Sequence, residues 1–211
     1  MTYRSVSKQI ETWIWKFHIY IGLYLLLFML LFFISGLLLN HPEWKFTQFW
    51  ANRRESTFEQ TVRLPKVPDD LAKARDIMQQ LGLSGEITLV TNRPVEGQFN
   101  FRVVRPGKTV QVKTDLNGES VSVREFRVNI WGISSALHLF TGVRGNQERD
   151  WFMTKIWSVS IDAVALGLIF LVVSSFYLWY KHKRKRLLGL VILGWGVFFC
   201  GFFLFGLNWM N

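Results

Sequence analysis

The chain has 211 residues, half of them apolar, and it carries a formal net charge of +10 with 19 Phe and 10 Trp. Apolar residues at this density, gathered into long uncharged runs, exclude an ordinary soluble domain. Residues 42–152 hold 16 basic and 13 acidic residues, a net charge of only +3, so no nucleic-acid-binding surface is expected there. The single cysteine, Cys200, excludes a disulfide within the chain.

Three segments are long and apolar enough to cross a membrane. Residues 17–40 and 187–211 contain no Lys, Arg, Asp or Glu, and residues 156–180 contain one charge, Asp162. A helix needs about 20 apolar residues to cross a hydrocarbon layer of about 30 Å. Because the apolar runs do not alternate with polar residues, they predict helices and not the strands of a barrel. We therefore expect a lipid membrane as the protein's environment.

The positions of the basic residues predict how the chain is oriented in that membrane. Residues 1–16 carry three basic residues, and residues 181–186 carry five. Short basic flanks of membrane spans remain in the cytoplasm. The N-terminus and residues 181–186 are therefore expected inside, whereas residues 42–152 and the C-terminal Asn211 are expected outside.

The outer segment predicts one helix and a small sheet. Residues 68–82 place apolar side chains on one face at helical spacing, with an acidic pair at the start and Gly82 at the end. Alternating residues predict four antiparallel strands, over residues 86–90, 98–104, 109–114 and 120–123. Residues 43–65 are mixed and charged, and we interpret them as a connecting segment. Residues 128–143 are uncharged but short for a span, which predicts an interfacial helix.

Together these patterns predict a membrane all-α three-helix bundle with an inserted small α+β domain outside the cytoplasm. The expected segments are an N-terminal segment with the first span (1–41), the α+β domain (42–127), an interfacial helix with a connector (128–152), the second span (153–182), and a basic turn with the third span (183–211). One helix on such a sheet gives a compact α+β domain whose core is small, so docking on the membrane part is expected to add stability.

The chain contains four histidines, and the predicted topology sorts them into two pairs. His18 and His182 lie at the inner face, whereas His41 and His138 lie at the outer face. Neutral imidazole is a good ligand for haem iron, and two imidazoles from different helices can hold one haem axially. Simpler roles are equally open: a helix cap for His41, a headgroup contact for His18, an interfacial polar residue for His138 and a stop-transfer run around His182. Spacing alone does not separate these interpretations.

Five short motifs are spread over nearly the whole chain. They lie at Phe17–Leu23, Ile34–His41, Leu137–Gly142, Asp162–Leu166 and Ser174–Trp179. Together they resemble the PepSY-associated transmembrane family, and the helix and sheet expected after the first span are similar to a single PepSY domain. The chain departs from the larger reductases of that family, which commonly have four or more spans and a longer outer region.

The resemblance implies a b-type haem protein of the bacterial inner membrane, and some members of the family are reductases that release iron from ferric siderophores in the periplasm. The implied function is electron transfer across the membrane by two haems, or by one. Quinol or a redox protein would be the donor, and a ferric chelate or a periplasmic protein the acceptor. His18 with His182 would hold the inner haem, and His41 with His138 the outer haem. The alternative is a haem-free accessory protein whose PepSY-like domain binds a partner, regulates a protease or aids assembly.

Three charged residues are further candidates for a haem site. Asp162 in the second span is expected to accept a hydrogen bond from a ligand imidazole, or else to pair with Lys155 on the same helix face. Arg144 and Arg149 are expected to hold haem propionates through charge-assisted hydrogen bonds, or else to contact lipid headgroups. Because the sequence has no flavin or nicotinamide fingerprint, electrons are expected to come from quinol or from another protein.

Overall fold

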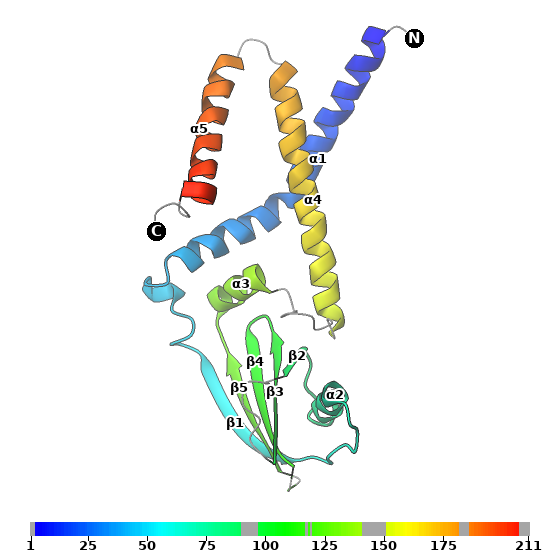
Figure 1. The fold of residues 1–211 in the computed structure, drawn as a ribbon, viewed down its shortest axis with the longest axis vertical. Helices are drawn as coiled ribbons and strands as arrows, with labels where there is room; N and C mark the ends of the chain where they lie inside the picture. The colour runs from blue at the N-terminus through cyan, green and yellow to red at the C-terminus, as the bar shows by residue number, and fades with distance from the viewer. Residues whose placement is uncertain are drawn as a thin grey trace. The chain divides into compact units, whose positions relative to one another are not determined.

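The computed structural model describes residues 3–89, 97–116, 118, 120–140, 151–181 and 186–206. Its elements are, in chain order (Figure 1), α1 (Tyr3–Asn40), the 3-10 turn η1 (Lys45–Thr47), β1 (Arg54–Thr61), α2 (Asp70–Gln80), β2 (Glu86–Leu89), β3 (Gln98–Arg105), β4 (Lys108–Asp115), β5 (Ser120–Arg127), α3 (Ile130–Leu139), α4 (Phe152–Lys181) and α5 (Arg186–Phe205). They form two compact units. The first holds α1 through Leu27, α4 from Ala163 and α5, and the second holds Phe28–Asp162.

Three helices of the described part of the chain are long and apolar enough to cross a membrane, as the sequence predicts. They are Lys8–Asn40 of α1, Phe152–Lys181 of α4 and Arg186–Phe205 of α5. Large apolar side chains cover their outer surfaces, where Leu27 is 74% exposed and Leu187 is 80% exposed. Apolar surface of this extent suits contact with lipid and not with water. The packing of the three helices into one bundle stays a prediction.

In the first unit, small residues let the long helices approach closely. A Cβ added to Gly167 of α4 would lie 2.8 Å from Leu25 Cδ1 of α1, and Leu25 is only 1% exposed. Near the C-terminus of α4, a Cβ on Gly189 of α5 would collide with the indole of Trp179. Close approach at small residues is a usual way for helices to associate in a membrane.

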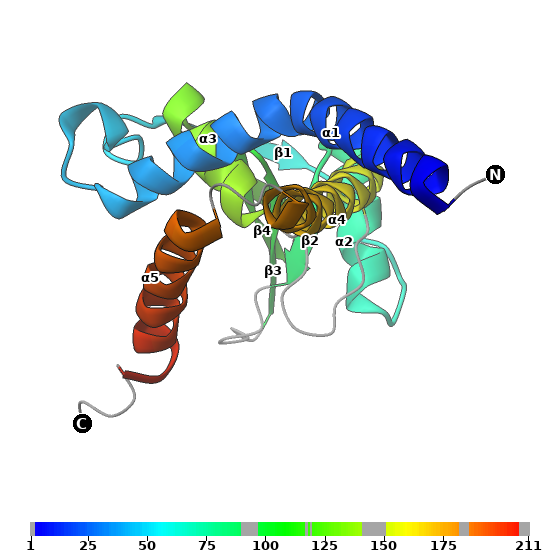
Figure 2. The ribbon, with the colours of Figure 1, turned by 90° about the horizontal axis from the view of Figure 1, so that it is seen from above.

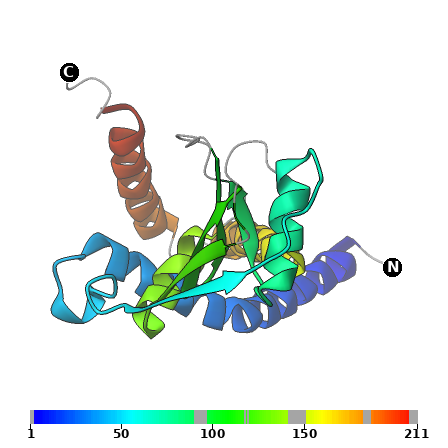
Figure 3. The same cartoon turned by 90° about the horizontal axis from the view of Figure 1, so that it is seen from below.

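The second unit contains an antiparallel sheet of five strands in the order β1-β5-β4-β3-β2, with α2 packed on one face (Figure 3). Alternate residues of the strands meet α2 in a core made of Val62, Ala74, Ile77, Ile87, Phe101, Val103, Val110, Val112, Val121 and Val123. Helix α2 begins at Asp69, whose carboxylate accepts from Ala72 N at 2.9 Å, and ends before Gly82, which has a φ of 62°. The predicted helix over 68–82 and the four predicted strands are thus confirmed, with β4 and β5 longer than expected.

The interpretation of residues 43–65 as a connecting segment is wrong, because residues 54–61 form the edge strand β1. This strand pairs with β5 from Arg54 opposite Arg127 to Thr61 opposite Ser120. Every residue of β1 is exposed. Because the strand has no buried face, its sequence shows no alternation of apolar and polar residues. Backbone hydrogen bonds to β5 pair it with the sheet.

The short helix predicted within 128–143 is confirmed as α3, and it is seated on the turn between β3 and β4. Asn129 caps α3 by accepting from Gly132 N at 3.1 Å. Gly107 in the turn has a φ of 83°, and a Cβ there would lie 2.5 Å from Ile133 Cγ1 of α3. A Cβ on Gly132 would likewise lie 2.6 Å from Val128 Cγ2. The sheet therefore sets the position of α3, the helix that carries His138.

Candidate functional site

His18 lies in the first unit, where its ring meets a serine of α4. His18 Nδ1 is 2.7 Å from Ser174 Oγ. The Ser174 hydroxyl in turn donates to the carbonyl of Phe170, one helical turn earlier, at 2.7 Å, and lies 3.1 Å from that of Leu171. Ser174 is 3% exposed. A serine in an apolar segment usually hydrogen-bonds to a carbonyl of its own helix. Here the same hydroxyl also bonds to a histidine of the neighbouring helix.

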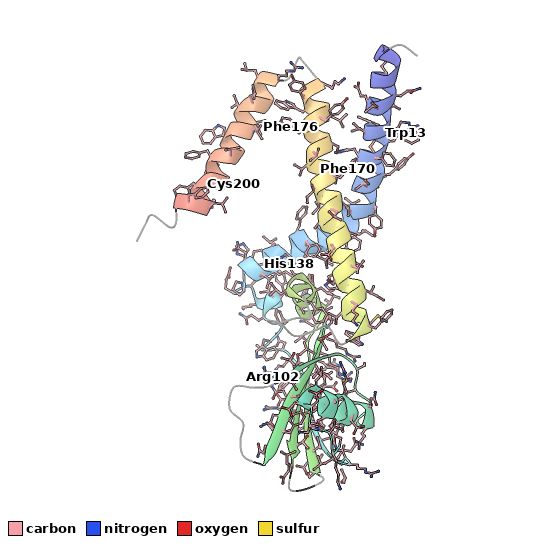
Figure 4. All side chains as sticks on the ribbon, turned by 45° about the vertical axis from the view of Figure 1, so that its right-hand side comes forward. Trp13, Arg102, His138, Phe170, Phe176 and Cys200 are labelled. Atoms are coloured by element: carbon pink, nitrogen blue, oxygen red, sulfur yellow. The ribbon has the colours of Figure 1, made fainter. Side chains whose placement is uncertain are left out.

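His138 lies in the second unit on α3, which runs beside the C-terminal part of α1 (Figure 2). Figure 4 labels His138, whose ring meets Ser35 of α1. His138 Nδ1 is 2.7 Å from Ser35 Oγ, and Ser35 donates to the carbonyl of Leu31 at 2.7 Å. Phe32 meets the imidazole edge-on at 5.2 Å between ring centres. A Cβ on Gly36 would be 3.5 Å from His138 Cε1, so the ring packs directly on the helix backbone.

The two sites share one arrangement, although the helices that supply it differ. In each, Nδ1 of a half-buried histidine meets a buried serine that also bonds to its own helix. Within the described part of the chain, the other ring nitrogen, Nε2, of His18 and His138 has no hydrogen-bond partner. A neutral imidazole whose second ring nitrogen is unpaired can coordinate haem iron through that nitrogen. The histidines at both sites are therefore suited to be ligands of haem iron.

His41 follows the end of α1 and has a different environment. Its Nδ1 is 3.2 Å from Glu43 Oε1, and its ring stacks on Trp44 with centres 4.4 Å apart and planes 3° apart. The pKa of Glu43 lies below its usual range because its own backbone N–H and the His41 ring both favour the ionised carboxylate. The structure records contacts of His41 with these neighbours and none with His138. The pairing of His41 with His138 as ligands of one haem stays a prediction.

The remaining candidates are only partly described. His182, Arg144 and Arg149 lie outside the described residues. Asp162 is exposed on α4, and among the described residues it accepts no hydrogen bond from a histidine and forms no ion pair with Lys155. Among the described residues, no group of three or more His, Cys, Asp or Glu side chains is placed to hold a metal ion. The three described histidines thus form hydrogen bonds with Ser174, Ser35 and Glu43, and not with Asp162.

Two serines of the histidine sites, Ser35 and Ser174, carry a signal in the sequence. Ser35 and Ser174 interrupt long apolar runs, and each falls in a motif of the family resemblance. A hydroxyl inside a membrane span needs a hydrogen-bond partner. That requirement marks the serines as candidates, but only the fold identifies a histidine as the second partner.

The comparisons with known proteins agree with the fold. The model of the PepSY_TM-like family matches residues 5–205, which is nearly the whole chain. No curated protein and no solved structure matches the chain significantly. The match runs through α1, the sheet, α3, α4 and α5, so it includes both histidine–serine sites. The chain therefore belongs to the PepSY_TM-like family.

Proposed function

We propose that this protein binds haem b through His18 and His138 and transfers electrons across the membrane. The observation that carries the proposal is the matching pair of histidine–serine sites, each with one open ring nitrogen. One site uses the N-terminal half of α1, and the other uses its C-terminal half. Since α1 is long enough to cross a membrane, two haems at such sites would belong to the two halves of one span.

The residues of each site have separable roles. His18 and His138 would each donate a ring nitrogen to iron, and a bound haem supplies reversible one-electron chemistry. Phe32 and Gly36 form the wall against which the His138 ring packs. His182 and His41 are the second ligands that the sequence predicts. Bis-histidine ligation would leave no open iron position, which suits electron transfer and not oxygen binding.

The direction of transfer follows from the predicted topology. The basic residues near the start of α1 and after α4 predict that His18 lies toward the cytoplasmic face and the sheet domain outside. Electrons from quinol or a redox protein would then enter near His18 and leave near His138. We propose a ferric chelate, such as a ferric siderophore, or a periplasmic protein as the acceptor.

The test compares His18→Ala and His138→Ala in the full chain, purified in detergent from cells supplied with haem. Haem per chain is measured together with the reduced-minus-oxidised visible spectrum. Each variant should lose one b-type haem and keep the other, so each variant serves as the folding control for the other. His41→Ala then tests the pairing, since it should lose the same haem as His138→Ala.

Two results would count against the proposal. Wild-type protein without haem would leave the accessory, haem-free alternative. Full haem content in both His18→Ala and His138→Ala would show that other residues hold the haem. If both variants lose all haem, size-exclusion chromatography shows whether they are still folded. Variants that are not folded are replaced by the more conservative His18→Gln and His138→Gln.

A further inference from the structure

We infer that Ser35 and Ser174 are positioning residues that fix the ring proton of His138 and His18 on Nδ1, so that Nε2 is the atom that each histidine presents to a ligand. The part of the inference that concerns haem rests on the proposed function. The part that concerns the proton depends only on the hydrogen bonds of the two sites.

A serine hydroxyl carries a single hydrogen. Ser35 Oγ lies 2.7 Å from the carbonyl oxygen of Leu31 and 3.2 Å from that of Phe32, and neither carbonyl carries a hydrogen. The hydrogen between these oxygens must therefore come from Ser35. Because the hydroxyl has no second hydrogen, it can only accept from His138 Nδ1 at 2.7 Å. His138 therefore carries its proton on Nδ1.

The same reasoning applies at the second site with the roles of the helices exchanged. Ser174 Oγ lies 2.7 Å from the carbonyl of Phe170 and 3.1 Å from that of Leu171, so its hydrogen is committed to its own helix. It accepts from His18 Nδ1 at 2.7 Å. At one site α1 supplies the serine, and at the other α1 supplies the histidine. Two separate helix pairs thus hold the imidazole in the same tautomer.

The opposite tautomer would be costly at these positions. If the serine donated to Nδ1, the hydroxyl and carbonyl oxygens would face each other at 2.7 Å with no hydrogen between them. Ser35 is 0% exposed and Ser174 is 3% exposed, so neither hydroxyl can turn to solvent instead. A buried polar group that loses its hydrogen bond is destabilising. The local hydrogen bonds therefore select Nδ1–H at both histidines.

This bond also tunes the ligand. A hydrogen bond from the second ring nitrogen to an oxygen orients an iron-binding imidazole and increases its basicity. Loss of such a partner typically costs about 10–100-fold in metal affinity. We therefore expect Ser35→Ala and Ser174→Ala each to weaken haem binding at one site by about 10–100-fold and to raise the midpoint potential of that haem, because a weaker donor stabilises ferric iron less.

The first experiment measures the ring protons directly in the wild-type chain. The full chain is labelled with 15N-histidine, produced without haem and studied at about pH 8.5, above the usual titration range of imidazole. Two-bond 1H–15N correlation spectra identify which ring nitrogen carries the proton, and each ring is assigned by its loss in a His→Gln variant. The inference predicts Nδ1–H at His18 and His138. A proton on Nε2 at either residue would overturn it there.

The second experiment uses the serine variants in haem-loaded protein. Ser160→Ala is the matched control, because Ser160 Oγ bonds to the carbonyl of Ile156 at 2.9 Å on α4 but has no histidine partner. Haem affinity and midpoint potential should change in Ser35→Ala and Ser174→Ala and not in Ser160→Ala. Unchanged values in both serine variants would refute the positioning role while leaving haem binding intact. Absence of haem from wild-type protein would instead refute the proposed function, whereas the tautomer measurement would stand by itself.

Discussion

Replacement of Gly107 by alanine should loosen α3 from the sheet and so disturb the helix that carries His138. Two costs add at this position. A φ of 83° is unfavourable for a residue with a Cβ, by about 1–2 kcal/mol. The new Cβ would also lie 2.5 Å from Ile133 Cγ1 and 3.1 Å from its Cδ1, and overpacking of this kind costs about 1–3 kcal/mol. We therefore expect Gly107→Ala to destabilise the seating of α3 by about 2–5 kcal/mol.

Gly82 offers a control with the same backbone conformation and none of the packing. It lies after α2 with a φ of 62°, and a Cβ there would meet no atom within 4 Å. Gly82→Ala should therefore cost only the backbone term, about 1–2 kcal/mol. The difference between the two variants isolates the contact between the β3–β4 turn and α3, at about 1–3 kcal/mol.

Amide hydrogen exchange measured by mass spectrometry on the full chain in detergent reads this difference, because exchange reports local opening free energies. Relative to wild type, exchange of α3 peptides in Gly107→Ala should accelerate about 5–150-fold more than exchange of α2 peptides in Gly82→Ala, since each 1.4 kcal/mol corresponds to a factor of ten. Peptides covering α2 should respond to Gly82→Ala. Equal exchange of α3 in the two variants would refute the inference that the turn holds α3 in place.

Two further predictions concern the stability of the sheet domain. Burial by itself raises the pKa of Glu125, but hydrogen bonds from Lys108 and Arg127 outweigh it and hold the pKa below the reference value of 4.5. A carboxylate whose pKa is lower in the folded state adds stability that is complete above pH 4.5 and is lost as the pH falls through its folded-state pKa. The thermal unfolding temperature should therefore fall in this pH range. It should fall less in Glu125→Gln, which lacks the titrating carboxyl group. Asp69→Ala removes the cap that accepts from Ala72 N and should cost about 1 kcal/mol, seen as faster exchange in the first turn of α2 while α3 is unchanged.

Sequence patterns predicted the long apolar helices and the strands that have one buried face. The long apolar runs predict α1, α4 and α5 because the thickness of a bilayer demands about 20 apolar residues. The alternation of Val110, Val112 and Thr114 predicts β4 because one face of that strand is buried. Strand β1 has no such face, since all its residues are exposed at the sheet edge. Its formation depends on backbone pairing with β5, which a local pattern cannot reveal.

In the candidate site, the sequence identifies the histidines but not the residues that bond to them. The histidines stand out in the sequence because imidazole is rare in apolar helices and can bind iron. Their bonding partners do not stand out, because Ser35 and His138 are 103 positions apart and His18 and Ser174 are 156 positions apart. The sequence offers Asp162 as one candidate partner because a carboxylate is costly in a membrane, yet serine hydroxyls bond the rings of His18 and His138. Only the packing of α3 and α4 against α1 brings these groups together.

The most direct test of haem-based electron transfer is the reduced-minus-oxidised visible spectrum of the purified full chain, with haem quantified per chain. Two b-type haems per chain, both reducible, are the result that the account predicts, and reduction of ferric chelates is then the next assay. A chain that contains no haem after expression with ample haem supply would contradict the account, and would leave His18 and His138 as structural contacts of a haem-free membrane protein.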